Sequence, residues 1–278
     1  MILLIVNNNP YHYEIIESVI NQYDKILSIN KTQISKILLK IIPDESFIAY
    51  IKMKYPAIII NGNSYFNMKY LINVSIYHSN YDLIRKMKNS YYITHETHDD
   101  FKQHDNVLST TPLCGTNKYM YFTDLPFSEK KQKHNIPIYI IQGELKRRNW
   151  NLLKKILERK YEYEYKIKII GKGEIPTQLK ELMDEYKDTI ILKQHLSFQD
   201  YHAEFLDCYG IIPCISLQTN KVYYENKITS SINYGIGYKL CFIIDNELQN
   251  IYRINNAYVY EKNIEEEFSN SLKNFYLL

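Results

Sequence analysis

Short apolar runs alternate with helix-like segments over residues 136–244, and this alternation restricts the possible folds more than any other feature of the sequence. Each run is too short for a helix of ordinary length. Continuous apolar runs of this kind are typical of parallel strands that are buried on both faces of a sheet. The five runs are IPIYIIQG (136–143), YKIKIIG (165–171), TIILKQ (189–194), GIIPCIS (210–216) and LCFII (240–244).

The segments between the runs carry the signals of helix starts. An apolar stripe at helical spacing follows residue 149, and Pro176 precedes a second such stripe, as proline does in the first turn of a helix. Ser197 and Asp200 have the spacing of a capping box at the start of a third helix. Strands and helices that alternate in this way form right-handed βαβ units, so the sequence predicts an α/β fold with a doubly wound, mostly parallel sheet.

A second α/β domain is expected in the N-terminal half, where the alternation is less regular. ILLIVNNN (2–9) has the pattern of a first strand, after which Asn9 is expected to cap a helix that Pro10 opens. Further strands are expected at AIIIN (57–61), NVSIYH (73–78) and SYYITH (90–95).

The polar stretch FSEKKQKHN (127–135) has no apolar period, so we place the domain boundary there. A chain of 278 residues is long for one compact core and sufficient for two domains. The expected parts are an N-terminal Rossmann-like domain (1–133), a second Rossmann-like domain (134–262) and a final helix (263–278).

Charge, cysteine usage and the N-terminus exclude several classes of protein. A net charge of +3 is too small to indicate a nucleic-acid partner. The four cysteines lack metal-ligand spacing, so Cys208, Cys214 and Cys241 are interpreted as free thiols in or beside buried elements. The apolar start MILLIV (1–6) is too short for a signal peptide or a membrane span. We therefore expect a soluble, cytoplasmic protein without an integral membrane segment.

Candidate ligand-binding groups follow the predicted strands, because ligands of open parallel sheets bind at the carboxyl ends of the strands. In GELKRRN (143–149), Arg147 and Arg148 precede a helix start and offer forked donors to a diphosphate. A solvated basic turn would explain the same residues. In GKGE (171–174), Gly171 would let the backbone approach a ligand closely, although an ordinary tight turn is the alternative.

The stretch YYENKITSSINYGIGYKLCFII (223–244) concentrates hydrogen-bonding groups at one helix start. Thr229, Ser230 and Ser231 stand in the first turn, with Lys227 just before it. One helix cap needs one such residue, so three in a row exceed what capping requires. Glu225 could accept hydrogen bonds from sugar hydroxyls. The alternative is a well-capped surface helix.

Residues 136–262 resemble the nucleotide-sugar half of GT-B glycosyltransferases. IQGELKRRNWNLLKKIL is similar to the first strand, basic turn and helix of that half, and YKIKIIGKGE to its second strand and glycine turn. ENKITSSINYGIGYKLCFII aligns without gaps to the donor-site signature, in which two acids stand eight residues apart. Glu225 falls on the first acid. Asn233 falls on the second, where an amide replaces the usual carboxylate.

The resemblance implies a two-domain, hexosyltransferase-type enzyme that moves a sugar from a UDP- or GDP-sugar to a hydroxyl of a glycan, protein or lipid. It implies no cofactor and no metal, and a final helix (263–278) that crosses back toward the N-terminal domain. Glu225 would contact the sugar, Asn233 the ribose, and His195 in KQHL (193–196) the nucleobase. The groups that would neutralise the diphosphate are Arg147, Arg148, Lys227 and the helix start at Thr229, Ser230 and Ser231.

The N-terminal half offers candidates for a general base. His95 lies in THETHDD (94–100), after a predicted strand, where a histidine can accept the proton of an attacking hydroxyl. His78 is a second candidate, and His12 in NNNPYH (7–12) could contact the acceptor or the donor sugar. A solvated loop is the alternative for 94–100. Metal binding is disfavoured there, because the spacing is not helical and a clear third ligand is missing.

The main alternative to an enzyme is a catalytically degenerate GT-B domain that binds a sugar nucleotide or a protein partner. Asn233 and the short N-terminal half support that alternative. A phosphorylase would need a much longer chain and a lysine that carries pyridoxal phosphate. An epimerase would need several acids in the cleft, and the sequence does not supply them at identifiable positions.

Overall fold

The chain folds into two compact units in the computed structural model. Unit 1 comprises Met1–Pro126 together with Asn226–Ile228, and unit 2 comprises Phe127–Glu225 and Thr229–Leu278. The chain thus returns to unit 1 for three residues between two segments of unit 2. The structure describes residues 1–62, 68–76, 89–97, 99, 101, 104–114, 119–121, 123–129 and 134–277.

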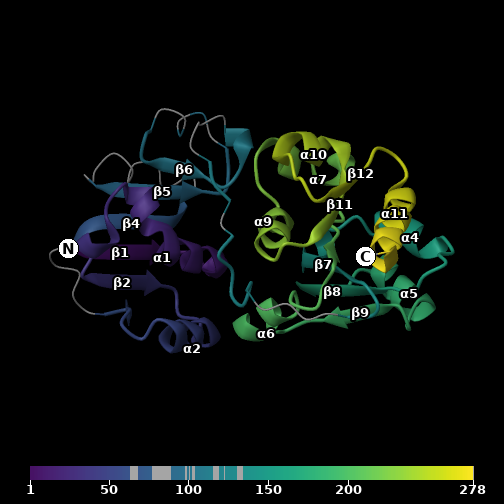
Figure 1. Cartoon of the computed structure of the whole chain (residues 1–278), viewed down its shortest axis with the longest axis horizontal. Helices are drawn as coiled ribbons and strands as arrows, with labels where there is room; N and C mark the ends of the chain where they lie inside the picture. Colours follow the sequence, from purple (N-terminus) through teal and green to yellow (C-terminus); the bar gives the residue numbers. More distant parts are fainter. Residues whose placement is uncertain are drawn as a thin grey trace. The chain divides into compact units, whose positions relative to one another are not determined.

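Unit 1 is built on a six-stranded sheet in the order β3-β2-β1-β4-β5-β6, and all of its strand pairs are parallel (Figure 1). This is the order of a doubly wound dinucleotide-binding fold, with its switch point between β1 and β4. The elements are β1 (Ile2–Asn7), α1 (Tyr13–Leu27), η1 (Lys31–Gln33), β2 (Lys36–Ile41), α2 (Glu45–Lys54), β3 (Ile59–Ile60), β4 (Met68–Ile76), β5 (Ser90–Thr94), β6 (Val107–Ser109) and η4 (Pro112–Cys114).

Helix α1 begins at Tyr13, three residues later than the sequence pattern suggested. Asn9 does not cap it, because its Oδ1 atom accepts the backbone N–H of Tyr11 (3.1 Å). Asn7 Oδ1 likewise accepts from Asn9 N (3.1 Å), so both amides hold the β1–α1 turn. His12 then stands at the N-cap position with a left-handed backbone (φ 67°). Local amide-to-backbone bonds of this kind compete with helix formation.

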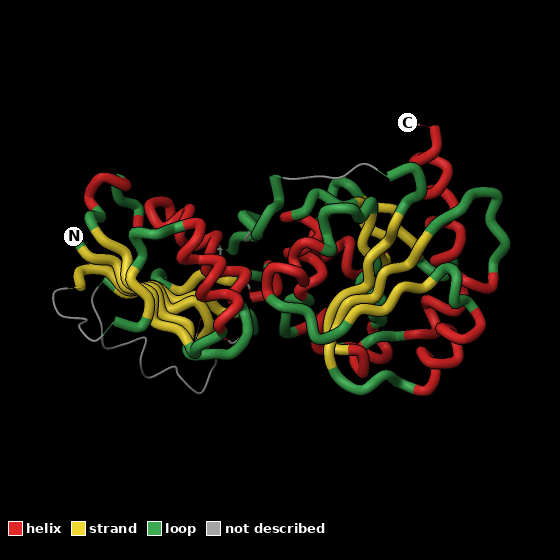
Figure 2. Tube along the Cα trace, turned by 90° about the horizontal axis from the view of Figure 1, so that it is seen from below, coloured by secondary structure: helices red, strands yellow, loops and turns green. Residues whose placement is uncertain are grey.

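Unit 2 repeats the same architecture. Its sheet has the order β12-β11-β10-β7-β8-β9 with parallel pairs throughout, and helices lie on both of its faces (Figure 2). The elements are β7 (Ile138–Glu144), η5 (Leu145–Arg147), α4 (Trp150–Glu158), β8 (Lys166–Lys172), α5 (Thr177–Glu185), β9 (Ile190–Lys193), α6 (Phe198–Ala203), β10 (Gly210–Ile211), α7 (Leu217–Asn220), α8 (Val222–Glu225), α9 (Ser230–Gly237), β11 (Cys241–Asp245), α10 (Asn246–Tyr252), β12 (Ala257–Tyr260) and α11 (Ile264–Leu277).

The fold class predicted from the sequence is therefore confirmed, and each of the five apolar runs of residues 136–244 contains a strand. The fourth strand, β10, is shorter than its run, because Pro213 lacks the N–H that would continue the ladder. Ser197 caps α6 as expected, accepting the backbone N–H of Asp200 (3.2 Å). Cys208, Cys214 and Cys241 are free and buried, also as expected.

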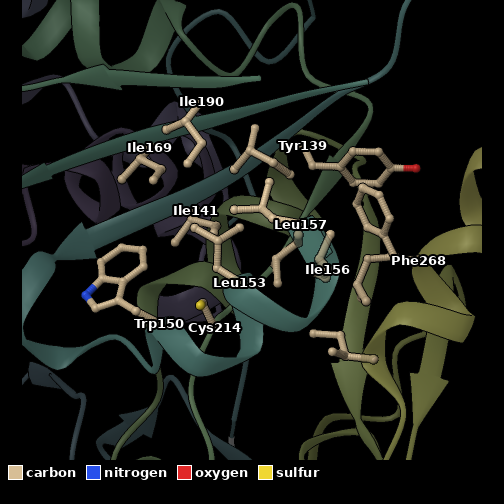
Figure 3. Packing of buried hydrophobic residues seen from close by; sticks show 14 of the residues in the cluster. Tyr139, Ile141, Trp150, Leu153, Ile156, Leu157, Ile169, Ile190, Cys214 and Phe268 are labelled. Carbon is tan, nitrogen blue, oxygen red and sulfur yellow. The ribbon is translucent and has the colours of Figure 1, made fainter. Parts of the chain in front are cut away.

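Alternate side chains of β7 and β8 face two different environments, because successive residues of a strand point to opposite faces. Tyr139, Ile141 and Ile169 pack in an apolar core under α4, α5 and α11 (Figure 3). Gln142 and Lys168 face the side of α6 and α9, where they form polar contacts. One face of the sheet is thus an apolar core, and the other carries buried polar groups.

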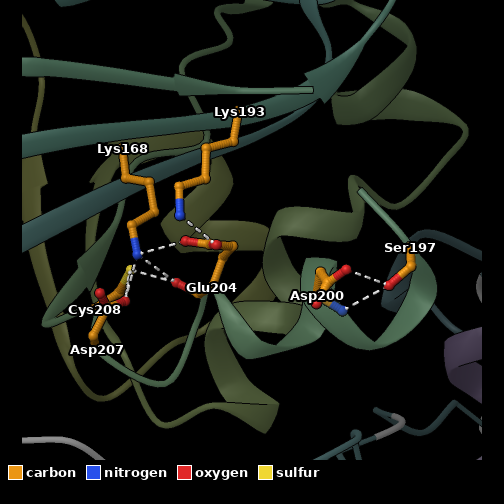
Figure 4. A network of polar contacts seen from close by, with 7 residues as sticks. All are labelled: Lys168, Lys193, Ser197, Asp200, Glu204, Asp207 and Cys208. Atoms are coloured by element: carbon orange, nitrogen blue, oxygen red, sulfur yellow. Dashed lines mark hydrogen bonds and ion pairs between the residues drawn. The ribbon is translucent and has the colours of Figure 1, made fainter. Parts of the chain in front are cut away.

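Lys168 anchors the segment after α6 to the sheet (Figure 4). Its Nζ atom is 2.5 Å from Asp207 Oδ1 and 3.0 Å from Glu204 Oε2. Lys193, in the neighbouring strand β9, donates to the other oxygen of Glu204 (2.6 Å). Two strands are therefore tied to one carboxylate, which fixes the position of α6 over the end of the sheet.

Helix α11 packs on its own unit. Its buried residues Ile264, Phe268 and Leu272 belong to the apolar core of unit 2, and Ser271 Oγ is hydrogen-bonded to Tyr139 Oη (2.8 Å). The crossing of this helix toward the N-terminal domain was implied by the resemblance, whereas the packing that the structure describes is with β11, β12 and α4. Among the described helices, none has both the length and the apolar character needed to cross a bilayer.

Gly235 lets α9 lie directly on β11. A Cβ atom at this position would be 2.1 Å from the buried ring of Phe242, far inside contact distance. We expect Gly235→Ala to lower the free energy of unfolding by about 1–3 kcal/mol, the usual cost of an extra methyl group in a packed core. Urea unfolding followed by circular dichroism measures the change. Asn270→Ala on the exposed side of α11 is the control, and an equal midpoint for both variants would contradict the prediction.

Candidate donor site

The polar groups of unit 2 converge where β7 ends. The switch point of this sheet lies between β7 and β10, and doubly wound folds bind ligands beside the carboxyl ends of such strands. Strand β7 ends there with Gln142, Gly143 and Glu144. Helix α9 contacts both β7 and β10, so its first turn lies at the same edge of the sheet.

Gln142 holds four groups together at this edge. Its Nε2 atom donates to Ser230 Oγ (2.9 Å) and to Ser231 Oγ (3.0 Å) at the start of α9. Its Oε1 atom accepts the hydroxyl of Tyr201 in α6 (2.8 Å). Its backbone oxygen accepts Nη2 of Arg148 (2.5 Å). A single buried amide therefore connects the sheet with two helices and an arginine.

Arg148 is a buried cation with unused donors. The residue is 9% exposed, and its Nε and Nη1 atoms have no hydrogen-bond partner among the described residues. Burial lowers the pKa of its guanidinium, with smaller effects from neighbours that include Tyr223, Cys214 and Tyr201. A buried charge without a counter-ion is unfavourable, so this site is suited to receive an anion.

Gly143 makes room for the arginine. It has a positive φ (119°), and a Cβ atom on it would lie 2.0 Å from Nη2 of Arg148. Gly171, the paired residue in β8, has a packing role too, since a Cβ atom there would lie 2.1 Å from the backbone oxygen of Gly143. These glycines permit the close pairing of β7 with β8 beside the arginine.

The hydroxyls at the start of α9 are not used to cap it. Thr229 is the N-cap residue, yet its side chain makes no capping hydrogen bond. Thr229 and Ser231 are both buried. Asn233, one turn further along α9, is 4% exposed, and its Oδ1 atom has no hydrogen-bond partner among the described residues. The first turns of α9 thus present buried polar groups together with the positive end of the helix dipole.

Other expected site residues of unit 2 lie on its surface. Arg147 is exposed, and its Nε atom pairs with a carboxylate oxygen of Glu144 (2.9 Å). Glu225 is exposed at the end of α8 and pairs with Lys221 (3.1 Å). His195 is exposed and has a left-handed backbone (φ 55°) in the loop after β9. The structure gathers Arg148, Ser230 and Ser231 around Gln142. It leaves Arg147, Glu225 and His195 at the periphery.

Lys227 belongs to unit 1. It forms an antiparallel bridge with Glu96, and its Nζ atom is bonded to the carboxylate of that residue. Backbone bonds on either side reinforce the bridge: Thr97 N donates to Asn226 O (2.6 Å) and Ile228 N to His95 O (3.4 Å). The cation expected at the diphosphate is therefore ion-paired in this structure.

His95 is buried behind His12 in unit 1. The two rings are stacked, with centroids 3.8 Å apart and an interplanar angle of 9°. Nε2 of His95 lies 3.2 Å from the backbone oxygen of Val74, and Nδ1 lies 3.5 Å from Thr110 Oγ1. His12 is partly exposed, and its Nδ1 atom lies 3.5 Å from a carboxylate oxygen of Glu14. His12, not His95, is the ring of this pair that solvent reaches.

Some of the predicted site residues fall outside the described part of the chain, and some residues of the observed site were not predicted. The candidate base His78, and His98 of the 94–100 stretch, lie outside the described residues. Among the residues that the structure does describe, no group of three or more His, Cys, Asp or Glu side chains could hold a metal ion. The sequence reasoning missed Gln142 and Tyr201. The available signal for Gln142 was a polar side chain near the end of a strand that is otherwise apolar.

Comparison with known proteins gives structural relatives only. No family model matches the sequence, and no curated protein is significantly similar to it. Among solved structures, AviGT4, a glycosyltransferase involved in avilamycin A biosynthesis, has a TM-score of 0.59 at 11% identity, covering 98% of this chain and 88% of AviGT4. The N-terminal domain of Candida albicans trehalose-6-phosphate phosphatase has a TM-score of 0.51 at 8% identity, covering 98% and 90%.

A Listeria monocytogenes protein assigned as a UDP-N-acetylglucosamine 2-epimerase has a TM-score of 0.50 at 10% identity, covering 99% of this chain and 88% of that protein. Such low identities show a shared fold and nothing finer. The chain has the GT-B glycosyltransferase fold, as the sequence resemblance implied. Because a glycosyltransferase, a phosphatase domain and an epimerase share this fold, the activity has to be argued from the site itself.

Burial lowers the pKa of His95 well below 6.5, and the neighbouring charges of His12 and Lys227 act in the same direction, against the bond to Val74. The unfolded chain therefore binds a proton below about pH 6.5 that the folded chain does not bind. We expect the free energy of unfolding to decrease as the pH is lowered below about 6.5, with His95 contributing up to about 1.4 kcal/mol per pH unit. Thermal midpoints across pH 7.5–5 measure this. His95→Gln should flatten the dependence, and the exposed control His134→Gln should not; equal profiles would contradict the assignment.

Proposed function

We propose that this protein is a glycosyltransferase that moves a sugar from a nucleoside diphosphate donor, a UDP- or GDP-sugar, to a hydroxyl acceptor. The observation that carries the proposal is the buried guanidinium of Arg148, whose Nε and Nη1 atoms lack partners among the described residues. It stands at the switch point of unit 2, hydrogen-bonded to the residue that also holds the first turn of α9. The GT-B fold of the chain agrees with this activity.

The proposed chemistry is stabilisation of the leaving diphosphate. When the bond between sugar and phosphate breaks, negative charge grows on the phosphate oxygens. Charge-assisted hydrogen bonds from Arg148 and the dipole of α9 would strengthen as that charge develops, which lowers the barrier. The guanidinium is already desolvated, so little reorganisation is needed during the reaction. These groups would suffice without a metal ion, so we propose a metal-independent transfer.

The exposed candidate residues of unit 2 would contact the donor once it is bound. Arg147 forms a surface ion pair with Glu144, and Glu225 forms one with Lys221. Surface pairs of this kind contribute about 0–1 kcal/mol and exchange easily. We propose that Glu225 contacts the sugar and Asn233 the ribose, with the loop around His195 beside the nucleobase. Gly171 would act through packing. Lys227 would have to leave Glu96 to reach a phosphate.

His12 is the proposed general base. Glu14 lies 3.5 Å from its Nδ1 atom, an arrangement that favours a proton on Nδ1 and leaves Nε2 to accept one. The stacked ring of His95 supports His12 from behind. His95, the base suggested by the sequence, would then fix the orientation of the base instead of taking the proton itself.

A binding module without catalysis is the second candidate, favoured by Asn233 at a position where GT-B donor sites usually carry an acid. Hydrolysis of the donor separates the two, because an active transferase releases nucleoside diphosphate slowly to water. A thermal-shift panel of UDP, GDP, CMP and dTDP, with and without a divalent cation, first identifies the preferred nucleobase. Stabilisation without donor hydrolysis would favour the binding module.

Arg148→Ala tests the transferase directly. We expect kcat/KM for donor hydrolysis or transfer to fall about 10²–10³-fold, as when one donor to a developing anion is removed. The thermal midpoint without nucleotide should be unchanged or higher, since the variant no longer buries an unpaired charge. Arg159→Ala, an exposed arginine after α4, is the control. An Arg148 variant with the turnover of the control would contradict the proposal.

His12→Gln tests the base. We expect transfer to the acceptor to fall about 10²–10⁴-fold, the usual contribution of general base catalysis. Affinity for the nucleoside diphosphate should be unchanged, because the donor groups belong to unit 2. Initial rates of transfer and titration calorimetry measure the two quantities, with His134→Gln as the control. Loss of nucleotide affinity in the His12 variant would speak against a role restricted to proton transfer.

A further inference from the structure

We propose that Gln142 is a positioning residue that sets the direction in which the hydroxyls of Ser230 and Ser231 donate, and that it thereby prepares the start of α9 for an anion. This inference rests on the proposed function of the donor site. It concerns a residue that does not itself contact the nucleotide in the proposal. Gln142 acts through the groups around it.

The amide of Gln142 is held in one orientation. The side chain is 1% exposed, so water does not compete for its hydrogen bonds. The hydroxyl of Tyr201 donates to Oε1 from α6. With Oε1 occupied as the acceptor, Nε2 and its two hydrogens face the two serines of α9. Tyr201 in turn follows the capped start of α6, and the Lys168–Glu204 pair holds the end of that helix.

The orientation of the amide determines what the serines can do. A hydroxyl has one hydrogen and two acceptor positions. Because Ser230 Oγ and Ser231 Oγ each accept a hydrogen from Nε2, each hydroxyl has to aim its own hydrogen away from Gln142. Ser231 Oγ also accepts from Thr229 Oγ1 (3.5 Å). Neither serine hydroxyl donates a hydrogen bond within the described part of the chain. A phosphate oxygen, which only accepts, fits this arrangement.

The backbone of the same residue positions the arginine. The carbonyl oxygen of Gln142 takes Nη2 of Arg148 and leaves Nε and Nη1 as the unpaired donors. Gly143 keeps the space beside that carbonyl open for the guanidinium. Gln142 therefore orients three donors, one through its backbone and two through its side chain. An acceptor-only side chain at this position would turn the two serine hydrogens inward.

The experiment compares Gln142→Glu with Gln142→Met by titration calorimetry. The probes are UDP, GDP and ADP, each paired with its own nucleoside. A carboxylate accepts both serine hydrogens, so we expect Gln142→Glu to bind the preferred diphosphate about tenfold more weakly, or worse. Gln142→Met, which releases the serines without reversing them, should lose less. The nucleosides should bind all variants within about twofold of the natural protein, since they lack the phosphates. Gln178→Glu on α5 is the charge-matched control.

A double-mutant cycle keeps the test decisive if Gln142→Glu does not fold. Gln142→Met is combined with Ser230→Ala and Ser231→Ala. If Gln142 acts through the two hydroxyls, its substitution should have no further effect on diphosphate affinity once they are gone. Additive losses in the combined variant would overturn the inference. So would an equal loss of affinity for diphosphate and nucleoside, which indicates general distortion of the site.

The outcomes also separate this inference from the proposed function. If no diphosphate binds the natural protein, the donor site itself is wrong. If a diphosphate binds and every Gln142 variant binds it as well as the Gln178 control, the donor site stands and the role of Gln142 is wrong. A loss confined to the diphosphate, greatest in Gln142→Glu and absent from the serine-free background, supports both.

Discussion

A guanidinium that is buried without a counter-ion is the interaction on which the interpretation of unit 2 depends. Water outside the fold would solvate Arg148 at no cost, so its burial has to be compensated by the surrounding structure. The bond to the Gln142 carbonyl satisfies one of its nitrogens, and Gly143 provides the space for it. The remaining donors keep an unfavourable free energy that an anion would relieve. An anion that pairs with these donors would therefore bind more strongly than it would to a solvated arginine.

The two faces of the unit 2 sheet divide the work between stability and binding. The face under α4 and α11 is apolar, and its side chains pack against Trp150, Leu153 and Phe268 of these two helices. The opposite face bears Gln142 and Lys168, which are buried and hydrogen-bonded. Period-two alternation along each strand lets a single strand serve both faces. The apolar face provides the hydrophobic free energy that permits buried polar groups on the other.

The fold could be predicted from the sequence wherever apolar runs were continuous. The strands of residues 136–244 were found because their apolar runs are nearly continuous, a pattern typical of parallel strands. β2 was missed because its sequence, KILLKI, mixes exposed lysines with buried residues, and β12 because it is short and its first three residues, Ala257–Val259, are only partly buried. The start of α1 was placed too early, because the side chains of Asn7 and Asn9 bond to the loop backbone instead of capping the helix.

The candidate site could be predicted only in part, since its decisive features are long-range. Arg147 and Arg148 are adjacent and chemically identical, and nothing in the sequence says that one is exposed and the other buried. The difference arises from the 3₁₀ turn η5, which directs consecutive side chains apart. His12 and His95 are likewise 83 positions apart in the chain and become a stacked pair only in the folded unit. The sequence shows which residue types are present, but it does not show which of them are buried or which side chains they contact.

The presence of amides instead of carboxylates at this site follows from the same electrostatic argument. The neighbours that act on it include two tyrosines, a thiol and a second arginine. A carboxylate within hydrogen-bond distance would pair with the guanidinium, and a phosphate would then have to displace it at a cost of several kcal/mol. Amides avoid this competition, because they offer hydrogen bonds without a charge. Gln142 at the end of β7 and Asn233 in α9 are both such amides. An amide in place of the second acid of the donor signature is therefore compatible with an anion site, and it keeps the positive potential of Arg148 and α9 available to a bound anion.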